Sequence, residues 1–530
     1  MKKFTLLVAL LFAFSFAQAQ QNILLIIADD LGADYCGFTP GANDTANMPN
    51  VRSLIPKSVY FTNAWASPYC SSTRAGMLTG RYSFRHGVGT VIGGSGSNDL
   101  DSAEVTIADM LKYHAPLTYR TANIGKWHVN QQTPIKTKWP TQKFGYDLYK
   151  GNFLGELSDY YNWTKITNGL QTDTITTYAT TETVNDAIAW LDTLPSNKPF
   201  FMWLAFNAPH SPFHLPPANL HTVPGLTGTP QHINANRSLY FKAMTEAMDT
   251  EIGRLIQWMK TNNRFDSTTI IFMGDNGNDK RVSQIADSSH VKGTLYDYGV
   301  HVPFLISGNR VVNPNRSSDA LVNVQDVFGT TMDLANFTNW VSAYPSTNTL
   351  DSKSLYPILI NQLTDVRDYS FTELFTTPTA TVQDGKTIRT KDYHLIRFDN
   401  GQEAFYHIAV DPEEQLELLS TSMTSNDTGN YILLCNYMNA LLATPYCSGA
   451  LSTRDVQTLS PNFQSNSDYL QASFEKDFTW QLLSLEGKVI LNGRSDKKRL
   501  LLSTNNLVPG YYIFQLVANN QRWNYKWIKN

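Results

Sequence analysis

NILLIIADDLG, residues 22–32, contains an unbroken apolar run from Asn22 to Ala28 that ends in Asp29, Asp30 and Gly32. An apolar run of this length, closed by acidic residues and glycine, predicts a strand that is buried on both faces, as in a parallel sheet. Three more apolar runs, at residues 199–206, 267–273 and 302–306, likewise end in polar residues or glycine. We therefore expect four buried parallel strands in one sheet.

Helical patterns lie between these strands. Residues 177–194 and 238–260 each repeat apolar side chains at helical spacing, for example Val184 with Ala187 and Met244 with Met248. Alternating strands and helices predict an α/β domain with a large, mainly parallel central sheet flanked by helices. In such sheets ligands bind at the carboxyl ends of the strands.

Composition and charge exclude some classes of function. The 530 residues are 42% hydrophobic and 16% charged, with a formal net charge of −3. This balance is typical of a globular protein large enough for several domains. It gives no support for a nucleic-acid partner or for a polybasic contact with a membrane surface.

The N-terminus has the pattern of a signal peptide over residues 1–19. Lys2 and Lys3 precede a short apolar run, and Ala17-Gln-Ala19 is a small-x-small cleavage site. The run is shorter than the ~20 residues that a membrane-spanning helix needs. We expect cleavage after Ala19 and no membrane span, so that the protein is secreted, displayed at the cell surface or periplasmic.

Export exposes the four cysteines to an oxidising compartment. Cys435 and Cys447 are close in sequence, but spacing alone leaves open whether they form a disulfide. Cys36 is expected to be a small buried residue, which leaves the role of Cys70 to be explained.

The second half of the chain predicts smaller domains. Short strand-like runs at residues 386–390, 393–398 and 403–408, with an Asn-Gly turn before the last, indicate a small antiparallel sheet, followed by a helix over residues 431–442. Beyond a polar linker the remainder is rich in short strands and turns. The predicted order is signal peptide 1–19, α/β domain 20–364, smaller subdomain 365–451, linker 452–467 and β-rich tail domain 468–530.

Polar residues at the predicted strand ends suggest a metal site. Asp29 and Asp30 follow one strand, and Asp275 and Asn276 follow another. Adjacent carboxylates repel each other unless a cation lies between them, and hard oxygen donors suit Ca²⁺ or Mg²⁺ better than zinc. Any one aspartate alone could instead cap a helix.

Cys70 stands at the start of a predicted short helix that ends at Gly80, with Arg74 one turn after it on the same side. The start of a helix favours anions. The residues alone leave open an activated thiolate, a phosphate-binding turn and a buried structural cysteine.

Cys70-Ser-Ser-Thr-Arg74, followed by Ala-Gly-Met-Leu-Thr-Gly-Arg81, resembles the signature of the formylglycine-dependent sulfatases of the alkaline phosphatase-like superfamily. Residues 389–397 and 411–414 resemble the smaller carboxy-terminal subdomain of that family. Six further stretches match the family in order up to about residue 310: Ile27–Gly32, Met48–Asn50 with Phe61–Asn63, Gly125–His128, Ala208–His210, Gly274–Gly277, and Lys292–Tyr296 leading into Val302–Phe304.

The resemblance implies how Cys70 would act. In this family a maturation enzyme oxidises the cysteine to formylglycine, an aldehyde that hydrates to a geminal diol. One hydroxyl attacks the sulfur of a sulfate ester, and the second then loses its proton so that sulfate is expelled and the aldehyde returns. By the same resemblance Asp29, Asp30, Asp275 and Asn276 would hold one Ca²⁺, which lowers the pKa of the diol and offsets charge in the transition state.

The resemblance also assigns roles to five further side chains. Arg74 and Lys126 would stabilise the ionised diol, and His128 would take the proton that triggers release of sulfate. His210 and Lys292 would contact the sulfate or the bridging oxygen, with His210 protonating the leaving alcohol.

Ser72 is a departure from the family pattern, and the tail carries a second resemblance. Ser72 stands where the family commonly has proline or alanine, and we expect Cys70 to be converted nevertheless, because the arginine and the Leu-Thr-Gly sequence are kept. The tail, with residues 478–489, 507–513 and 526–530, resembles the carboxy-terminal sorting domain of type IX secretion in Bacteroidetes. This implies secretion machinery as a partner and removal of the tail, whereas the alternative is a β-sandwich module that stays attached.

The expected function is therefore that of a secreted sulfatase, with a sulfated poly- or oligosaccharide as substrate. A phosphonate or phosphodiester hydrolase of the same superfamily is the alternative enzyme, and a catalytically inactive carbohydrate-binding relative is the alternative of another class. Residues 88–99, 131–164 and 213–237 are expected to form the rim of the pocket. Tyr160, Tyr161, Trp163 and His214 in these loops could contact a sugar ring or could be packing residues.

Overall fold

The computed structural model describes residues 21–39, 42, 44–93, 98–376 and 381–447, and then residues 462–465, 469–474, 477–484, 489–495, 499–504, 506–508, 510–518 and 521–529. The chain divides into two compact units, residues 1–430 and 431–530. The predicted signal peptide lies outside the described residues, as do residues 452–461 and 466–467 of the predicted linker. The intervening Asn462–Ser465 form a strand, contrary to their placement in that linker.

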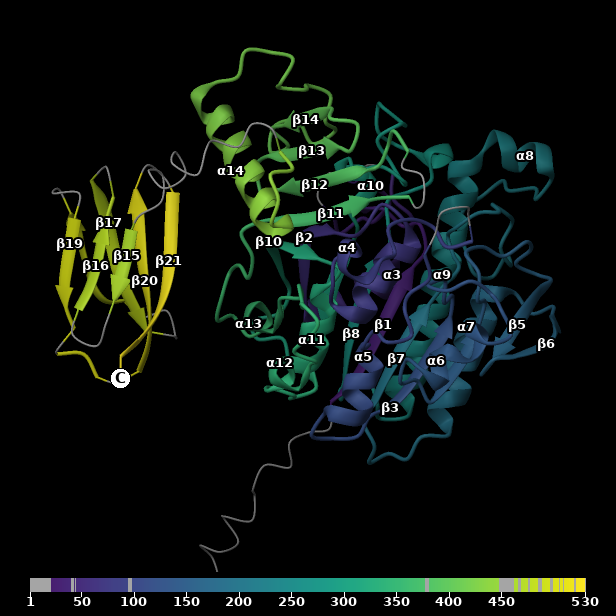
Figure 1. Cartoon of the computed structure of the whole chain (residues 1–530). Helices are drawn as coiled ribbons and strands as arrows, with labels where there is room; N and C mark the ends of the chain where they lie inside the picture. Colours follow the sequence, from purple (N-terminus) through teal and green to yellow (C-terminus); the bar gives the residue numbers. More distant parts are fainter. Residues whose placement is uncertain are drawn as a thin grey trace, which may run out of the picture. The chain divides into compact units, whose positions relative to one another are not determined.

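A ten-stranded sheet forms the centre of the first unit (Figure 1). All seven residues of β1 (Asn22–Ala28) are buried, because β1 lies inside this sheet. β1 pairs in parallel with β7 (Phe200–Ala205) and β8 (Thr268–Gly274), as the apolar runs predict. The order across the sheet is β10 (Arg316–Asn323), β2 (Ser58–Trp65), β9 (Phe304–Ser307), β8, β1, β7, β3 (Arg120–Gly125), β4 (Leu148–Gly151), β5 (Trp163–Thr167) and β6 (Leu170–Ile175).

The direction of β9 corrects one prediction. The run at residues 302–306 was expected to be a parallel strand, but β9 pairs antiparallel with both β2 and β8. A parallel neighbour needs a crossover that returns along the whole sheet, whereas the chain from β8 to β9 turns back through a loop and the short helix α10 (Asp297–Val300). A fully buried strand is apolar in either direction, so its composition does not reveal its orientation.

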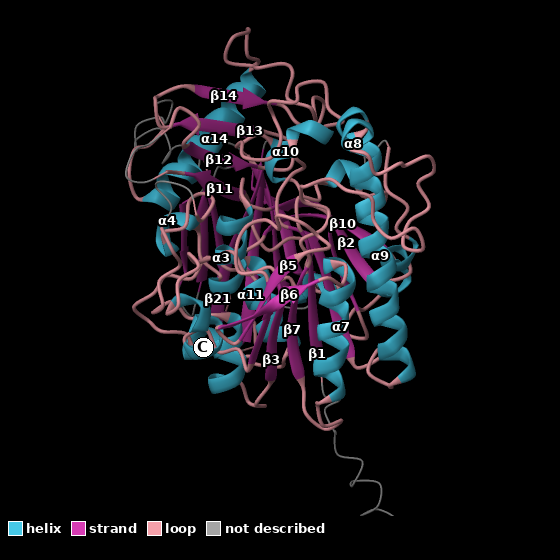
Figure 2. Cartoon of the chain, turned by 90° about the vertical axis from the view of Figure 1, so that its right-hand side faces the viewer, coloured by secondary structure: helices cyan, strands magenta, loops and turns pink. Residues whose placement is uncertain are grey.

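Helices cover both faces of the sheet. Alternate residues of β1 enter two different cores, with Ile23 and Leu25 on one face and Leu24 and Ile26 on the other. Figure 2 shows α7 and α9, which pack on each other and confirm the two predicted helices. The helices of the first unit are α2 (Pro49–Arg52), α3 (Cys70–Thr79), α4 (Ser83–His86), α5 (Ile107–Asp109) with a π-helical turn over Met110–His114, α6 (Trp139–Gln142), α7 (Ala179–Asp192), α8 (Pro230–Ala235), α9 (Arg237–Thr261), α10, α11 (Asp326–Leu334), α12 (Trp340–Ala343) and α13 (Tyr356–Leu359).

A smaller antiparallel sheet follows in the chain, as predicted. The Asn-Gly turn closes its last hairpin: Gly401 has a φ of +96° and its N–H donates to the carbonyl oxygen of Phe398 at 3.0 Å. The predicted helix at residues 431–442 begins earlier than expected, since α14 runs from Ser425 to Leu442. The strand order is β11 (Ser370–Leu374), β12 (Gly385–Arg389), β13 (His394–Phe398) and β14 (Glu403–Tyr406).

The second unit contains two antiparallel sheets that share an apolar core, which includes Leu470, Phe478 and Phe514. A disulfide joins Cys435 to Cys447, the pairing that spacing alone left open. Among the described helices, none has both the length and the apolar character required to cross a bilayer. The sheets are β15 (Asn462–Ser465), β16 (Tyr469–Ser473) and β19 (Arg499–Ser503), and then β18 (Val489–Ser495), β17 (Phe478–Ser484), β20 (Gly510–Ala518) and β21 (Gln521–Lys529).

Candidate active site

The carboxyl ends of the central strands carry the predicted site. Asp29 and Asp30 follow β1, Asp275 follows β8, and Lys126 follows β3. Because these strands are parallel neighbours or lie one strand apart, their ends meet at one edge of the sheet. Hydrogen bonds and ion pairs join eight of the ten predicted residues, and the Cys70–His128 pair lies beside them, with Cys70 Sγ within 4.8 Å of carboxylate oxygens of Asp29 and Asp275. The eight residues are Asp29, Asp30, Arg74, Lys126, His210, Asp275, Asn276 and Lys292.

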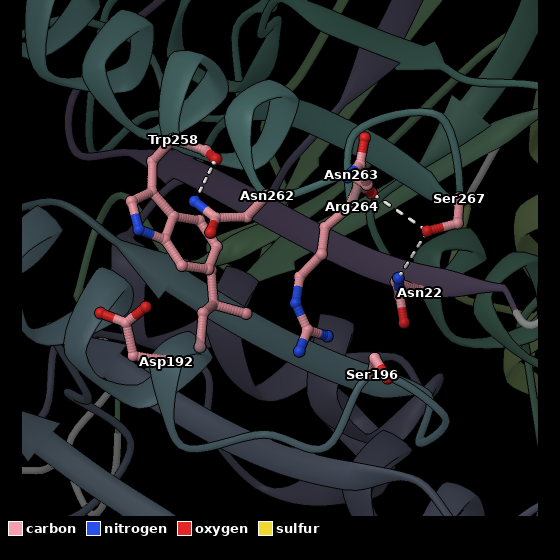
Figure 3. Close-up of a pocket in the computed structure, with 9 residues that line it drawn as sticks. Asn22, Asp192, Ser196, Trp258, Asn262, Asn263, Arg264 and Ser267 are labelled. Carbon is pink, nitrogen blue, oxygen red and sulfur yellow. Dashed lines mark hydrogen bonds between the residues drawn. The ribbon is translucent and has the colours of Figure 1, made fainter.

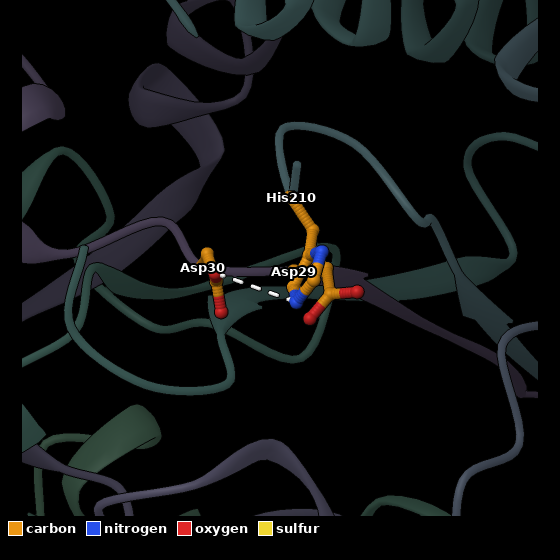
Figure 4. A group of neighbouring side chains, drawn as sticks. All are labelled: Asp29, Asp30 and His210. Carbon is orange, nitrogen blue, oxygen red and sulfur yellow. Dashed lines mark ion pairs between the residues drawn. The ribbon is translucent and has the colours of Figure 1, made fainter. Parts of the chain in front are cut away.

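The acidic residues are held by the backbone and by an amide. The N–H of Asp30, whose φ is +66°, donates to Asp275 Oδ1 at 3.0 Å. Asn276 Nδ2 donates to Asp30 Oδ1 at 2.8 Å. Figure 4 shows Asp29, Asp30 and His210 together, with His210 Nε2 lying 3.7 Å from Asp30 Oδ2.

Three basic side chains face these carboxylates. Arg74 Nη2 lies 2.7 Å from Asp275 Oδ2, and Lys126 Nζ lies 2.6 Å from Asp29 Oδ2. Lys292 Nζ donates to Asp30 Oδ1. Three buried carboxyl groups therefore face three positive charges, which offsets much of the cost of burying any negative charge that they carry.

Two oxygens of this cluster have no hydrogen-bond partner among the described residues. Asp29 Oδ1 and Asn276 Oδ1 are both buried and accept no hydrogen bond, although Arg74 Nη2 lies 3.9 Å from Asp29 Oδ1. Buried polar atoms are almost always satisfied, so such a pair on adjacent strand ends indicates a missing partner. Carboxylate and amide oxygens are the donors that Ca²⁺ prefers, and the residues present therefore fit a hard divalent cation.

The charges of the cluster depend on burial. Burial raises the pKa of Asp29 to about 8, although Lys126 acts in the opposite direction. Burial would also raise the pKa of Asp30, but Lys292 and His210 lower it below its usual value. A cation beside these oxygens would favour the ionised form of both groups.

Cys70 is the first residue of α3, and its side chain is buried against His128. Cys70 Sγ lies 3.2 Å from His128 Nδ1, while His128 Nε2 lies 3.0 Å from the carbonyl oxygen of Ile92. Nε2 must carry the proton in order to donate to that carbonyl, which leaves Nδ1 to accept from the thiol. Burial raises the pKa of Cys70 and lowers that of His128 well below its ordinary value. The thiol is therefore protonated and is not an activated thiolate.

The surroundings of Cys70 agree with the predicted short helix. Arg74 is fully buried one turn after Cys70, and α3 ends at Gly80 with a φ of +70°. Ser72 is buried, and its hydroxyl donates to the carbonyl oxygen of Tyr69 at 2.9 Å. The residue that departs from the sulfatase pattern is thus part of the first turn of the helix.

His210 and Lys292 mark the mouth of the site. Their side chains are 12% and 15% exposed, whereas the other eight predicted residues are at most 2% exposed. His210 Nδ1 lies 2.7 Å from the carbonyl oxygen of Ser211, so Nδ1 donates and Nε2 is free of its proton in the neutral form. Burial lowers the pKa of His210 to about 4, against the opposing effect of Asp30.

Sequence reasoning missed two residues that hold this arrangement together. Asn278 Oδ1 accepts from the N–H of Gly32 at 2.7 Å, and the carbonyl oxygen of Asn278 accepts from the N–H of Lys292 at 3.1 Å. Gly155 packs on His128, since a Cβ at this position would lie 2.4 Å from the imidazole Cε1. No local pattern indicates either contact, because the partners are distant in sequence.

The rim loops supply packing as well as exposed groups. Tyr160 and Trp163 are buried, at 2% and 6% exposure, which makes them packing residues. The ring of His214 packs against that of Tyr160 in a tilted arrangement, with ring centroids 4.2 Å apart, whereas Tyr161 is 38% exposed. Part of the first predicted rim loop, residues 94–97, lies outside the described residues.

Comparisons with known proteins agree with this geometry. The family model "Sulfatase" matches residues 21–337, and the model "N-sulphoglucosamine sulphohydrolase, C-terminal" matches residues 289–428. The chain is 24% identical over 389 residues to an uncharacterised sulfatase, YdeN, of Escherichia coli K12, covering 64% of this chain and 66% of that protein. It is 25% identical over 372 residues to human N-acetylgalactosamine-6-sulfatase, again covering 64% and 66%. The chain thus matches slightly less than two thirds of the length of these curated relatives.

Solved structures share the fold. The chain superposes on Ps i-CgsB in complex with k-i-k-neocarrahexaose with a TM-score of 0.66 and 22% identity, over 83% of this chain and 96% of that one. It superposes on BT4656 in complex with D-glucosamine-2-N,6-O-disulfate with a TM-score of 0.61 and 20% identity, over 79% and 98%. At these identities the structures show a common architecture, the alkaline phosphatase-like arrangement expected from the sequence.

Proposed function

The chain belongs to the sulfatase family, and on this premise we propose that it hydrolyses sulfate esters of poly- or oligosaccharides. The names of several similar proteins support a sulfated sugar as substrate, including N-acetylgalactosamine-6-sulfatase and the complex of BT4656 with D-glucosamine-2-N,6-O-disulfate. The observation that carries the proposal is the buried contact between Cys70 Sγ and His128 Nδ1, which are 3.2 Å apart. Cys70 Sγ also lies within 4.8 Å of carboxylate oxygens of Asp29 and Asp275.

Residue 70 would work as formylglycine, whose hydrated aldehyde supplies a nucleophile towards the sulfur of the ester. A protonated thiol at this position is a poor nucleophile, because burial raises the pKa of Cys70. This environment and the family signature at Cys70–Arg81 both support oxidation of Cys70 before catalysis.

Asp29, Asp30, Asp275 and Asn276 would hold one Ca²⁺. The unpaired Asp29 Oδ1 and Asn276 Oδ1 support this assignment. When bound, the cation supplies positive charge that favours ionisation of the nucleophile and offsets the charge of the sulfate.

The chain's own side chains would handle the protons and the negative charge. His128 Nδ1 already accepts from the group on residue 70 and can remove its proton. Arg74 and Lys126 place fixed positive charges beside that position, and Lys292 presents ammonium N–H groups at the mouth where an anion enters. His210 is neutral at pH 7 in the free enzyme, and a sulfate ester next to it would raise its pKa so that Nε2 can deliver a proton to the leaving oxygen.

The function is tested by measuring sulfate release from 4-nitrophenyl sulfate and from a panel of defined sulfated oligosaccharides. Bis(4-nitrophenyl) phosphate and 4-nitrophenyl phenylphosphonate are the competing substrates, because related folds include a phosphonate monoester hydrolase. Mass spectrometry of the peptide that bears residue 70, with the aldehyde trapped as a hydrazone, tests the modification. Turnover by protein with an unmodified thiol, or by the Cys70→Ala variant, would contradict the proposal, as would faster turnover of the phosphorus esters.

Export is a further part of the proposal. The Cys435–Cys447 disulfide supports an oxidising compartment, as expected for a chain with a signal peptide over residues 1–19. The tail over residues 468–530 would act as the sorting signal and be removed. The N-terminal sequence of protein recovered outside the cell should begin at Gln20, and its intact mass should show that the tail is missing. Retention of residues 1–19 would argue against cleavage of the signal peptide, and retention of the tail would argue against its removal.

A further inference from the structure

A groove of about 460 Å³ lies at the edge of the central sheet opposite the candidate active site (Figure 3). It opens where Asn22 begins β1 and Ser267 precedes β8, and between the C-terminal ends of α7 and α9. Asp29 and Asp275 stand at the other ends of these strands, roughly 20 Å away for a strand of seven residues. A ligand in the groove would therefore be separate from the site that hydrolyses the ester.

One aromatic side chain lines this groove. Trp258, on the last turn of α9, is half-buried, and its ring lies between Asp192 and Asn262 in Figure 3. Its indole N–H has no partner among the described residues. An indole ring that is open on one side and has a free N–H offers an apolar platform with a polar edge, which matches the C–H face and the hydroxyl rim of a pyranose ring.

The groove also holds a guanidinium group with unused donors. Arg264 Nη2 donates to the carbonyl oxygen of Leu194 at 2.6 Å, and no carboxylate of the described residues lies within 4.0 Å of this guanidinium. Arginine carries five N–H donors and binds planar or tetrahedral oxyanions well. Arg264 can therefore contact a sulfate ester or a carboxylate on a sugar ring.

The remaining lining groups suit hydroxyls. Asp192, Ser196, Asn262 and Asn263 are exposed polar residues around Trp258 and Arg264. Binding sites for small polar ligands combine an apolar surface with a few polar groups of this kind.

We propose that this groove is a second carbohydrate-binding site, which holds a sulfated polysaccharide chain while the active site acts on another part of it. Trp258 would stack on one sugar ring, Arg264 would contact an anionic substituent, and Asp192 would accept from hydroxyls. The inference rests on the proposed function, because a sulfated carbohydrate is the substrate proposed there. Two sites on one chain raise the local concentration of substrate at the active site.

The test is affinity electrophoresis of the full chain in native gels that contain ι-carrageenan, chondroitin sulfate or unsulfated dextran. All variants carry Cys70→Ala, so that the polysaccharide is not hydrolysed. Trp258→Ala is the main variant and Asp192→Ala the second, since loss of an acid at the end of α7 does not endanger folding. Tyr113→Ala is the matched control, because Tyr113 is an exposed aromatic residue, 63% accessible, that does not line the groove.

We expect at least one sulfated polysaccharide to retard the parent and the Tyr113→Ala variant. Trp258→Ala should weaken the apparent affinity about fivefold or more, the size of an aromatic stacking contact, and Asp192→Ala about threefold. No retardation of the parent, or equal retardation of the Trp258→Ala and Asp192→Ala variants and the parent, would overturn the proposal. Turnover of 4-nitrophenyl sulfate by the unsubstituted chain tests the proposed function separately, so the failure of one does not imply the failure of the other.

Discussion

The hydroxyl group of Tyr160 lies 2.7 Å from the backbone carbonyl oxygen of His210. It also lies 2.6 Å from the carbonyl oxygen of Asn207, so one phenol reaches both ends of the turn that carries the His210 side chain. Tyr160 is 2% exposed, and its ring packs against that of His214. A buried tyrosine in this position fixes the backbone of the turn, and with it the place of His210 at the mouth of the site.

Tyr160→Phe should therefore lower activity through His210. The substitution keeps the ring and its packing but removes the hydrogen bond, which is worth about 1–1.5 kcal/mol. We expect kcat/KM for an aryl sulfate to fall roughly five- to tenfold, the equivalent of that free energy. The pH profile of kcat/KM should shift as well, because the surroundings of the His210 imidazole change.

Tyr161→Phe is the matched control for this prediction. The hydroxyl of Tyr161 donates to the carbonyl oxygen of Leu215 at 2.8 Å, but the residue is 38% exposed and the contact does not involve His210. Its kinetics should match those of the parent. If Tyr160→Phe and Tyr161→Phe both had the rates and pH profiles of the parent, the Tyr160 hydroxyl would have no part in placing His210.

The unpaired oxygens predict how the protein responds to calcium. Protein stripped with EGTA should gain about 2.7 kcal/mol of stability at a Ca²⁺ concentration 100 times the Kd. Asn276→Ala removes one of the two unpaired oxygens and should raise that Kd at least tenfold, as measured by calorimetry. Asp287→Asn, at a residue 51% exposed and outside the cluster, should respond like the parent. An Asn276→Ala variant with unchanged affinity would place the cation elsewhere.

Much of the site was predictable because its polar residues directly follow strands that lie together in the sheet. Asp29 and Asp275 each follow an apolar run directly, and parallel strands bring such ends together. The helix from Cys70 to Thr79 was equally predictable, since Gly80, in the left-handed region, ends it. These features depend on residues that are close in sequence.

The remaining features depend on contacts that a sequence pattern does not encode. The N–H of Gly32 and the side chain of Asn278 are 246 residues apart, and no period links them. The aromatic residues Tyr160 and Tyr161 are neighbours in sequence, yet one is buried behind His210 and the other is exposed. The predicted direction of β9 was wrong because a strand buried on both faces has the same apolar composition whether it runs parallel or antiparallel to its neighbours.

The close approach of Gly155 to His128 supports a third prediction. A Cβ on residue 155 would lie 2.4 Å from Cε1 and 2.6 Å from Nε2 of His128, which is well inside van der Waals contact. Gly155→Ala should push the imidazole away from residue 70 and from the carbonyl oxygen of Ile92. We expect kcat to fall about 100-fold or more, within the range for loss of a positioned proton acceptor.

Gly429→Ala is the control for Gly155→Ala, because an added Cβ at Gly429 meets no atom within 4 Å. Its activity should equal that of the parent. The thermal midpoint of Gly155→Ala shows whether the loss is local. Retention of full activity by Gly155→Ala would show that His128 can move without effect and would remove it from the proposed chemistry.

His86 predicts how stability depends on pH. His86 is buried in α4, its Nδ1 accepts from the N–H of Val88 at 3.2 Å, and its Nε2 has no partner among the described residues. Burial, and then Arg81, lower the pKa of His86 from 6.5 to about 3 in the folded protein. The folded state therefore takes up its proton only at low pH, whereas the unfolded state takes up a proton as the pH falls below about 6.5.

The direction in which the unfolding free energy changes with pH follows from this difference in proton uptake. The contribution of His86 is fully present above about pH 6.5 and declines as the pH falls towards 3, because the unfolded state gains a proton that the folded state excludes. Between pH 7 and pH 5 this one group should cost the parent about 2 kcal/mol of unfolding free energy. His86→Asn keeps an acceptor near the N–H of Val88 but does not titrate in this range. Urea unfolding of both proteins at pH 7 and pH 5 should show that the variant loses about 2 kcal/mol less than the parent, and equal losses would mean that His86 is protonated in the folded state.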